Sequence, residues 1–280
     1  MQFETLASSN ISKVYAAMMG AFADYVMPVK LTQEQFEMKL KRDGVVADIT
    51  PIAVENQQIV GFNLMGLGEW NGITTAYDAA TGVLPAFRGN GITRKLFDFI
   101  RPTLENVGVK QCLLEVIIGN DGAHHIYEKM GFKPVRELVC YNGEPKGEHK
   151  LPEGFSYVGV DNLNLDDFQT WKDWQPSWQN SDFASRNILN RYQVVGVVKD
   201  GALVAYALLF RDTGYVAQMA VSPEYRRMGI GSRMFAFMAA LAKKPLHYVN
   251  VEAEAVGSHA FLKKIGMEET VRQYEMVMSL

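Results

Sequence analysis

The spacing of apolar residues predicts a mixture of strands and helices in the first half of the chain. Strand-like patterns occupy residues 46–56, 59–70, 73–84 and 112–118. Helical patterns occupy residues 9–25, 32–44, 92–100 and 121–131. Thr32 with Gln35 fits a capping box at the second helix, and Gly131 suits the end of the last one. Ser9 or Asn10 is expected to cap the first helix.

The second half of the chain repeats this order of elements. Strands are predicted at residues 155–160, 213–221 and 247–255, a hairpin at 192–210, and helices after Gly229 and at 258–266. A helical region at residues 165–190 is expected to break at Pro176. Arg88 recurs as Arg226 at an offset of 138 residues (88 to 226), and Gly131 recurs as Gly266 at an offset of 135 (131 to 266). Two landmarks at nearly one offset indicate two copies of one domain.

The segment between the two copies predicts where they divide. Residues 141–154 are rich in Gly, Pro and charged residues, which is typical of a linker. We therefore place the boundary near residue 148 and expect domains at residues 1–147 and 148–280. The predicted fold class is α+β, with strands in the middle of each copy and a βαβα run at its end.

Composition narrows the class of protein. The 280 residues are 48% hydrophobic and carry a net charge of −3, so the chain lacks the basic excess of a nucleic-acid-binding surface. Cys112 and Cys140 have no metal-ligand spacing, and a reducing, cytoplasmic location is expected. The N-terminal residues lack the pattern of a signal peptide, and no apolar run is long enough for a membrane helix. We expect neither metal, nucleic acid nor membrane as a partner.

The joint between strand and helix at residues 83–100 carries the candidate chemistry, and residues 220–241 repeat it. Glycines at the start of a helix expose backbone N–H groups at the positive end of the helix dipole, which predicts an anion site. Neither joint contains a Walker loop, and both lack the third glycine of a dinucleotide fingerprint. Simple tight turns remain the alternative interpretation of these glycines.

The two joints resemble motif A of the GNAT superfamily, the acyl-CoA-dependent N-acyltransferases, whose core is [QR]-x-x-G-x-[GA]. Residues 226–231 match it completely, whereas residues 88–93 depart from it at Thr93. Residues 114–132 resemble motif B of the family, with Asn120 and Tyr127 at the family's positions. In the second copy, Leu262 stands in place of Tyr127 and Ala255 in place of Asn120.

The resemblance implies two tandem GNAT domains, each an α/β/α sandwich with a mixed, largely antiparallel sheet flanked by helices. It implies acetyl-CoA as cosubstrate, held between two splayed strands with its pyrophosphate on the glycine joint. The implied CoA contacts are Gly82, Val83, Leu84, Arg88, Gly89, Asn90, Gly91, Ile92, Thr93, Asn120, Arg226, Arg227, Met228, Gly229, Ile230 and Gly231.

The resemblance also implies direct transfer of an acetyl group to an amine. Tyr127 is then the general acid for the leaving thiolate, and a backbone N–H near Val83 or Leu84 stabilises the oxyanion. Asp78 is the favoured general base, with Glu115 as an alternative. The acceptor is a small-molecule or peptide amine, and the chain is expected to be a monomer or a homodimer.

The unequal copies predict that residues 1–147 catalyse, whereas the second domain is non-catalytic or a second CoA site. One alternative is an active second domain beside a structural first one. The other is a non-enzymatic, CoA-binding regulatory module. Acidic residues at Asp24, Glu69 and Asp78 would suit a cationic acceptor.

Overall fold

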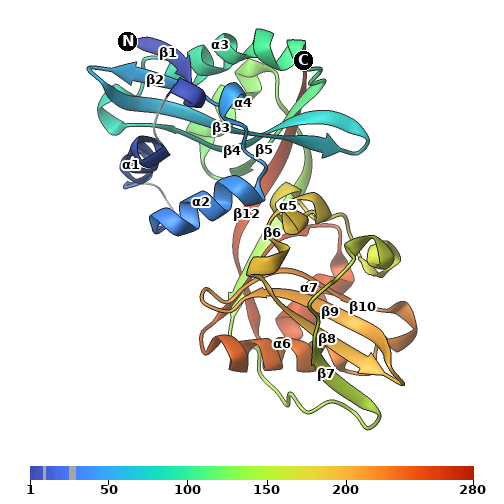
Figure 1. Ribbon diagram of the computed structural model, residues 1–280. Coiled ribbons are helices and arrows are strands. Elements are labelled where there is room, and N and C mark those ends of the chain that lie inside the picture. The colour runs from blue at the N-terminus through green and yellow to red at the C-terminus, as the bar shows by residue number, and fades with distance from the viewer. Residues whose placement is uncertain (9–10, 25–29) are drawn as a thin grey trace. The chain divides into compact units, whose positions relative to one another are not determined.

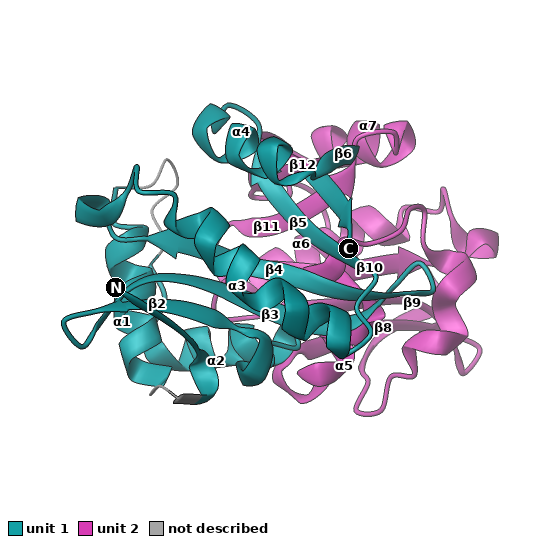
Figure 2. Ribbon diagram, turned by 90° about the horizontal axis from the view of Figure 1, so that it is seen from above, with its two compact units in different colours: residues 1–135, 275–280 teal, residues 136–274 magenta. Residues whose placement is uncertain are grey.

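The structure is a computed structural model that describes residues 1–8, 11–24 and 30–280. The chain divides into two compact units (Figure 2). Unit 1 comprises Met1–Val135 and Glu275–Leu280, and unit 2 comprises Arg136–Tyr274. Each unit combines a sheet with flanking helices, which confirms the predicted α+β class. The predicted caps Ser9 and Asn10 lie outside the described residues.

Unit 1 is built on a mostly antiparallel sheet with the strand order β1-β2-β3-β4-β5-β12. Its elements before the C-terminal strand are β1 (Gln2–Thr5), α1 (Ile11–Ala21), α2 (Gln33–Arg42), β2 (Pro51–Glu55), β3 (Gln58–Trp70), β4 (Ile73–Val83), α3 (Ile92–Asn106), β5 (Gln111–Ile117) and α4 (Asp121–Met130). Strands β1 to β4 pair antiparallel in sequence order, whereas β4 and β5 pair in parallel. A parallel pair needs a crossover connection, and α3 supplies it.

Helices cover both faces of the sheet of unit 1 (Figure 1). On one face, α1 and α2 bury Val14, Met18 and Phe36 against strands β2 and β3. On the other face, α3 packs Ile92 and Leu96 against the same strands. The amphipathic spacing of each helix therefore selects the face that it buries.

Local sequence signals fix the ends of two helices as predicted. Thr32 and Gln35 form the capping box of α2, in which each side chain accepts a hydrogen bond from the other residue's backbone N–H. Gly131 ends α4 in the left-handed region, with φ 106°. These caps fix one end of α2 and one end of α4. Both helices contact β4 beside the candidate site.

Unit 2 repeats this arrangement with the strand order β12-β6-β11-β10-β9-β8-β7. Its elements are β6 (Lys133–Gly143), β7 (Phe155–Gly159), α5 (Asp182–Asn187), β8 (Gln193–Lys199), β9 (Ala202–Phe210), β10 (Tyr215–Val221), α6 (Ile230–Ala242), β11 (Leu246–Glu252), α7 (Val256–Lys264) and β12 (Met267–Ser279). Strands β10 and β11 form its parallel pair, and α6 is the crossover. Figure 1 shows α6 and α5 on opposite faces of this sheet.

The helical region predicted at residues 165–190 is mostly not α-helix. Leu165–Trp171 and Trp178–Asn180 are 3-10 turns, and only α5 is α-helical. Pro176 lies in the stretch between the two 3-10 turns, where a ring without an N–H interrupts helical hydrogen bonding.

The boundary between the compact units does not coincide with the predicted linker. They divide between Val135 and Arg136, early in β6, and the chain returns to unit 1 at Glu275 within β12. The units divide in this way because two long strands, β6 and β12, each contribute residues to both of them. The boundary near residue 148 stays a prediction about domains.

Candidate active site

Strands β4 and β5 diverge at the centre of unit 1. They pair only over Thr75–Tyr77 and Gln111–Leu113. The register between β3 and β4 shifts after Asp78, which leaves Ala79 as the extra residue of a β-bulge. Lys39 Nζ of α2 donates to the Ala79 carbonyl oxygen over 2.9 Å and holds the bulged segment. The divergence exposes backbone groups of β4 that a strand partner would otherwise cover.

A cleft of about 660 Å³ opens beside the divergence. Its walls include Gly82 and Val83 of β4, Gly91 and Thr93 at the start of α3, and Tyr127 of α4. Gly89 and Gly91 have φ values of 79° and 68°, which only glycine adopts without strain. Among the described residues, no side chain caps α3, so its first N–H groups face the cleft as an anion site.

Two of the expected CoA contacts in unit 1 have partners or packing inside the protein. The N–H of Leu84 donates to the Val60 carbonyl over 2.9 Å, so it is not available to an oxyanion. Ile92 lines the cleft, and its side chain packs in the core beneath α3. Asn90 lies in the turn, where its side-chain amide donates to the carbonyl of Phe87.

Arg88 is bound within the protein rather than presented as a free cation. Its guanidinium donates to both carboxylate oxygens of Asp24, each over 2.7 Å, and to the Ala21 carbonyl over 2.8 Å. Its Nε donates to the Val83 carbonyl over 3.2 Å. Hydrogen bonding to Arg88 lowers the pKa of Asp24. The arginine thus clamps the end of α1 to the end of β4, and Asp24 is engaged in this clamp.

Asp78 and Tyr127 both line a small cavity of about 10 Å³, and Tyr127 also lines the cleft. The Tyr127 hydroxyl donates to Asp78 Oδ2 over 3.3 Å, and Thr81 Oγ1 donates to the same oxygen over 2.6 Å. Burial raises the pKa of Asp78 to about 6. Asn120, the other residue of motif B, caps α4 by accepting from the Ala123 N–H over 3.3 Å.

Glu115 lies on β5, two positions beyond the last residue that pairs with β4. Its Oε2 accepts a hydrogen bond from the Tyr77 hydroxyl over 2.6 Å. Burial raises the pKa of Glu115 to about 8, and the negative charge of Glu275 adds to the shift. Successive residues of a strand face opposite sides of a sheet, so Tyr77 with Glu115 faces away from Asp78 with Tyr127. The divergence thus has one carboxyl group on each side.

The raised pKa of Glu115 predicts how the stability of the protein changes with pH. The folded chain keeps this proton up to about pH 8, whereas a free glutamate loses it near its usual pKa of 4.5. The free energy of unfolding should therefore fall as pH rises through this window. Glu115→Gln should reduce this loss by at least about 1.4 kcal/mol, the equivalent of one pKa unit. Urea unfolding at pH 5 and pH 8 measures the effect, with the exposed Glu37→Gln as control. Equal pH slopes in the two variants would contradict it.

Unit 2 contains an equivalent cleft of about 980 Å³ at the start of α6. Gly229 has φ 78° and Arg227 has φ 63°, so Arg227 adopts the left-handed conformation that Gly89 has in unit 1. Arg226 repeats the clamp, donating to the carbonyls of Val221 (3.1 Å) and Trp171 (2.8 Å) and pairing with an aspartate carboxylate, that of Asp173 (2.7 Å). Of the other expected contacts, Gly231 lines the cleft, Met228 is exposed, and Ile230 is buried.

Unit 2 differs from unit 1 at the positions that carry proton chemistry. Leu262, in place of Tyr127, is 1% exposed. The β-bulge recurs after Val216, which therefore takes the place of Asp78. At the 135-residue offset, Asn250 stands in place of Glu115. The cleft of unit 2 therefore has the anion site but lacks the pair that Asp78 and Tyr127 form in unit 1.

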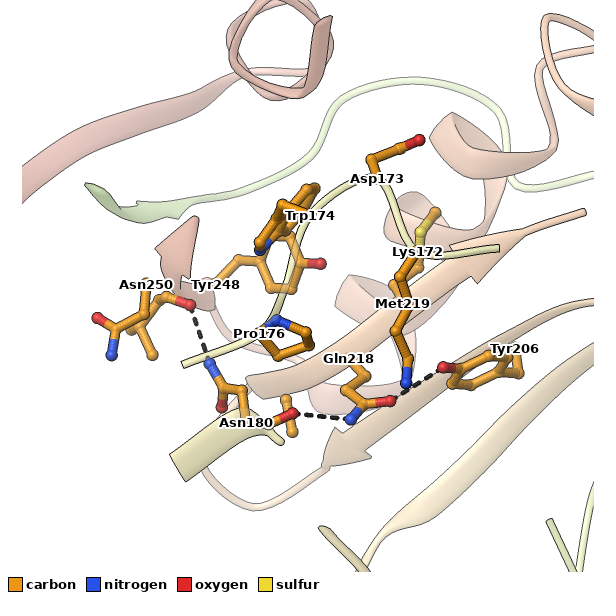
Figure 3. Close-up of a pocket in the computed structure, with 12 residues that line it drawn as sticks. Lys172, Asp173, Trp174, Pro176, Asn180, Tyr206, Gln218, Met219, Tyr248 and Asn250 are labelled. Atoms are coloured by element: carbon orange, nitrogen blue, oxygen red, sulfur yellow. Dashed lines mark hydrogen bonds between the residues drawn. The ribbon is translucent and has the colours of Figure 1, made fainter. Parts of the chain in front are cut away.

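The divergence between β10 and β11 is filled from within unit 2. A small cavity of about 20 Å³ lies there, and Figure 3 shows Trp174 and Pro176 among the residues that line it. Asn180 Nδ2 donates to the Val249 carbonyl of β11 over 3.0 Å, and Gln218 Nε2 donates to the Asn180 carbonyl over 2.7 Å. The Trp174 ring packs edge-on against Tyr248, with centroids 6.1 Å apart. These contacts leave room for about one water molecule where a substrate would have to enter.

The sequence did not reveal the residues that support Asp78 and Glu115. Asn63 donates to Thr81, which donates to Asp78, and Tyr77 holds Glu115. None of these residues belongs to a motif, and their roles depend on a bulge that leaves no sequence signal. Over the described part of the chain, no helix is long and apolar enough to cross a membrane. Nor do His, Cys, Asp and Glu residues in that part gather into a metal-binding group.

Comparison with a family model gives a match over most of the chain. The model of the acetyltransferase (GNAT) family matches residues 15–132 and again residues 159–267. The two matched segments correspond to the two repeats of the sequence.

Known proteins show the same likeness at lower identity. An N-alpha-acetyltransferase 30 from Schizosaccharomyces pombe is 28% identical over 91 residues, which are 32% of this chain and 61% of that protein. A GCN5-related N-acetyltransferase from Sphaerobacter thermophilus has a similar structure with a TM-score of 0.72 at 14% identity, over 99% of this chain and 95% of that one. A tandem GNAT protein from the clavulanic acid biosynthesis pathway also has a TM-score of 0.72, at 15% identity, over 99% and 98%. These structures share the tandem fold of this chain.

Proposed function

Because the chain belongs to the acetyltransferase (GNAT) family, we propose that it transfers an acetyl group from acetyl-CoA to a primary amine, and that unit 1 performs the reaction. One observation carries the proposal: the Tyr127 hydroxyl lies in the unit 1 cleft beside the divergence of β4 and β5, whereas unit 2 has Leu262 there. The anion site at Gly91 supports diphosphate binding in the same cleft.

The reaction is proposed as direct attack in a ternary complex. The neutral amine nitrogen forms a bond to the thioester carbon, and the carbonyl oxygen becomes an oxyanion that backbone N–H groups of the β4 bulge stabilise. The C–S bond then breaks, and the thiolate takes a proton from the Tyr127 hydroxyl. The amine nitrogen loses one proton to a base, so the products are a neutral amide and a free thiol.

Glu115 is the proposed base, in place of the favoured Asp78. Asp78 contacts Tyr127 and is thereby assigned to the acid side of the divergence. Glu115 faces the opposite side, and its pKa of about 8 suits proton acceptance near neutral pH. The exposed Glu69 lies at the β3–β4 hairpin, away from both groups.

Unit 2 is proposed to bind CoA without turning it over. Its cleft keeps the left-handed glycine at the start of α6, and Arg227 and Lys264 supply positive charge along its wall. The filled divergence and the loss of the tyrosine argue against catalysis there. Catalysis in unit 2, or binding without catalysis in either unit, would be the competing outcomes.

The proposed acceptor is the amine of a peptide N-terminus or of a small molecule. The likeness to an N-alpha-acetyltransferase makes peptides with free N-termini the first acceptors to test.

Turnover by the intact chain tests the proposal. Acetyl-CoA is incubated with a panel of peptides, polyamines and aminoglycosides, and the released thiol is measured with a chromogenic disulfide. We expect amine-dependent thiol release matched by N-acetylated product in mass spectrometry. Calorimetric binding of acetyl-CoA without turnover of any amine would favour the non-enzymatic alternative, and absence of both would refute the proposal.

A further inference from the structure

A chain of hydrogen bonds runs from β3 to the cleft of unit 1. Asn63 Nδ2 donates to Thr81 Oγ1 over 2.5 Å, and Thr81 Oγ1 donates to Asp78 Oδ2 over 2.6 Å. The same carboxylate oxygen accepts from the Tyr127 hydroxyl over 3.3 Å. That distance is long for a hydroxyl donor, as is common in catalytic sites before substrate binds. Asp78 therefore contacts Tyr127, the general acid of the proposed reaction.

The surroundings of Asp78 favour its neutral form. Nothing among the residues that the structure describes forms a hydrogen bond with its buried Oδ1. Burial is the main cause that raises the pKa of Asp78 to about 6. The titratable groups around it are Lys39 of α2, Cys112 of β5 and Tyr127. Lys39, which is paired with Asp43 over 2.6 Å, lowers the pKa of Asp78 by less than burial raises it.

At the positions in unit 2 that correspond to Asp78 and Tyr127, neither side chain can ionise. The bulge of β10 places Val216 at the position of Asp78, and Val216 is fully buried. Leu262 takes the position of Tyr127. A carboxyl group that served only to stabilise the bulge would be expected in both units, because both have the bulge. Its joint loss with the tyrosine links it to the hydroxyl.

We propose that Asp78 is a positioning residue that shares a proton with Tyr127, and this inference rests on the function proposed above. In the neutral state, the Asp78 carboxyl donates to the Tyr127 oxygen, which turns the tyrosine O–H toward the leaving sulfur. As the thiolate takes the Tyr127 proton, the tyrosine oxygen takes the Asp78 proton. Asp78 is left as a carboxylate, stabilised by donation from Thr81 and Tyr127, and solvent returns its proton after the thiol leaves.

Kinetics of Asp78→Asn test the inference, because asparagine keeps the shape and a donor but has no proton to give. Because Asp78 must be neutral and Glu115 must be ionised, wild-type kcat should pass through a maximum near pH 7 and fall as pH rises above about 8. The variant should lose about tenfold in kcat with a KM for acetyl-CoA within about twofold of wild type. It should also lose this descending limb of the pH profile. The matched control is Asp48→Asn, which makes the same change at an exposed site outside the cleft.

Two kinetic outcomes would overturn the inference. If Asp78→Asn kept the kcat of the wild type, the carboxyl group would not be needed. A slower variant that keeps the descending limb would show that Asp78 only supports the structure.

A titration that needs no turnover separates this inference from the proposed function. The Asp78 carboxyl carbon is followed by ¹³C NMR and identified by its disappearance in Asp78→Asn. We expect a midpoint near pH 6 that moves up in Tyr127→Phe, because the tyrosine hydrogen bond lowers the pKa of Asp78. A midpoint that does not respond to Tyr127→Phe would refute the shared proton even in an active enzyme. A responsive midpoint in a protein that acetylates no amine would instead refute the function.

Discussion

Replacing Tyr127 by phenylalanine should lower kcat by about 10²-fold while the KM for acetyl-CoA stays nearly unchanged. The variant removes one hydroxyl, and loss of a general acid typically costs 10² to 10⁴ in rate, about 10² at the low end. The ring should stay in place, because it packs edge-on against Phe132 with centroids 5.6 Å apart. Steady-state thiol release with the best amine of the panel measures the effect.

Two further variants give the result for Tyr127 its meaning. Tyr157→Phe removes a hydroxyl on β7 that donates to the His149 carbonyl, and it should leave kcat unchanged. Tyr248→Phe removes a hydroxyl of β11 from a residue that lines the cavity at the divergence of unit 2. If Tyr248→Phe slowed turnover and Tyr127→Phe did not, catalysis would have to be assigned to unit 2.

Gly91→Glu should weaken acetyl-CoA binding to unit 1 by about 100-fold, or about 2.7 kcal/mol. Gly91 begins α3 with φ 68°, where a side chain adds about 1 kcal/mol of strain. The new carboxylate also points into open space at the anion site, where it repels a diphosphate. Isothermal titration calorimetry measures both the affinity and the number of sites.

The matched variants for this prediction separate charge from strain and one unit from the other. Gly91→Gln has the same backbone strain without the charge, and it should bind at least about tenfold more tightly than Gly91→Glu. Gly229→Glu should remove only the site in unit 2, where φ is 78°. If Gly91→Glu left binding intact while Gly229→Glu abolished it, unit 2 would be the principal CoA site.

The repeated order of strands and helices could be predicted because it depends on local signals. The Thr32 capping box, the left-handed Gly131 and the amphipathic spacing after Gly91 each determine structure within one turn of helix. The 3-10 segments at residues 165–180 could not, because Trp171, Trp174 and Trp178 recur at helical spacing, whereas distant strands hold the segment in another conformation. The Asn180 contact with β11 is an interaction of that kind.

The cleft could be placed from the sequence, whereas the partners of its polar groups could not. Glycine spacing fixes the backbone of the joint, and the family resemblance adds Tyr127 and Asn120. Whether Arg88 meets a ligand or Asp24 depends on where the end of α1 lies, which no local pattern encodes. The direction in which Asp78 faces depends on the bulge at Ala79, and one extra residue reverses the side to which a strand residue points.

The division of β12 between the two units has a consequence for how the protein is made. Glu275–Leu280 are translated after all of unit 2, and they belong to the unit that was translated first. Unit 1 therefore cannot be complete until unit 2 has been translated, although its helices and other strands emerge more than a hundred residues earlier. Until β12 has been translated, β5 is an unpaired sheet edge that can pair with wrong partners. A gene fragment that stops after Val135 would encode that unfinished state permanently.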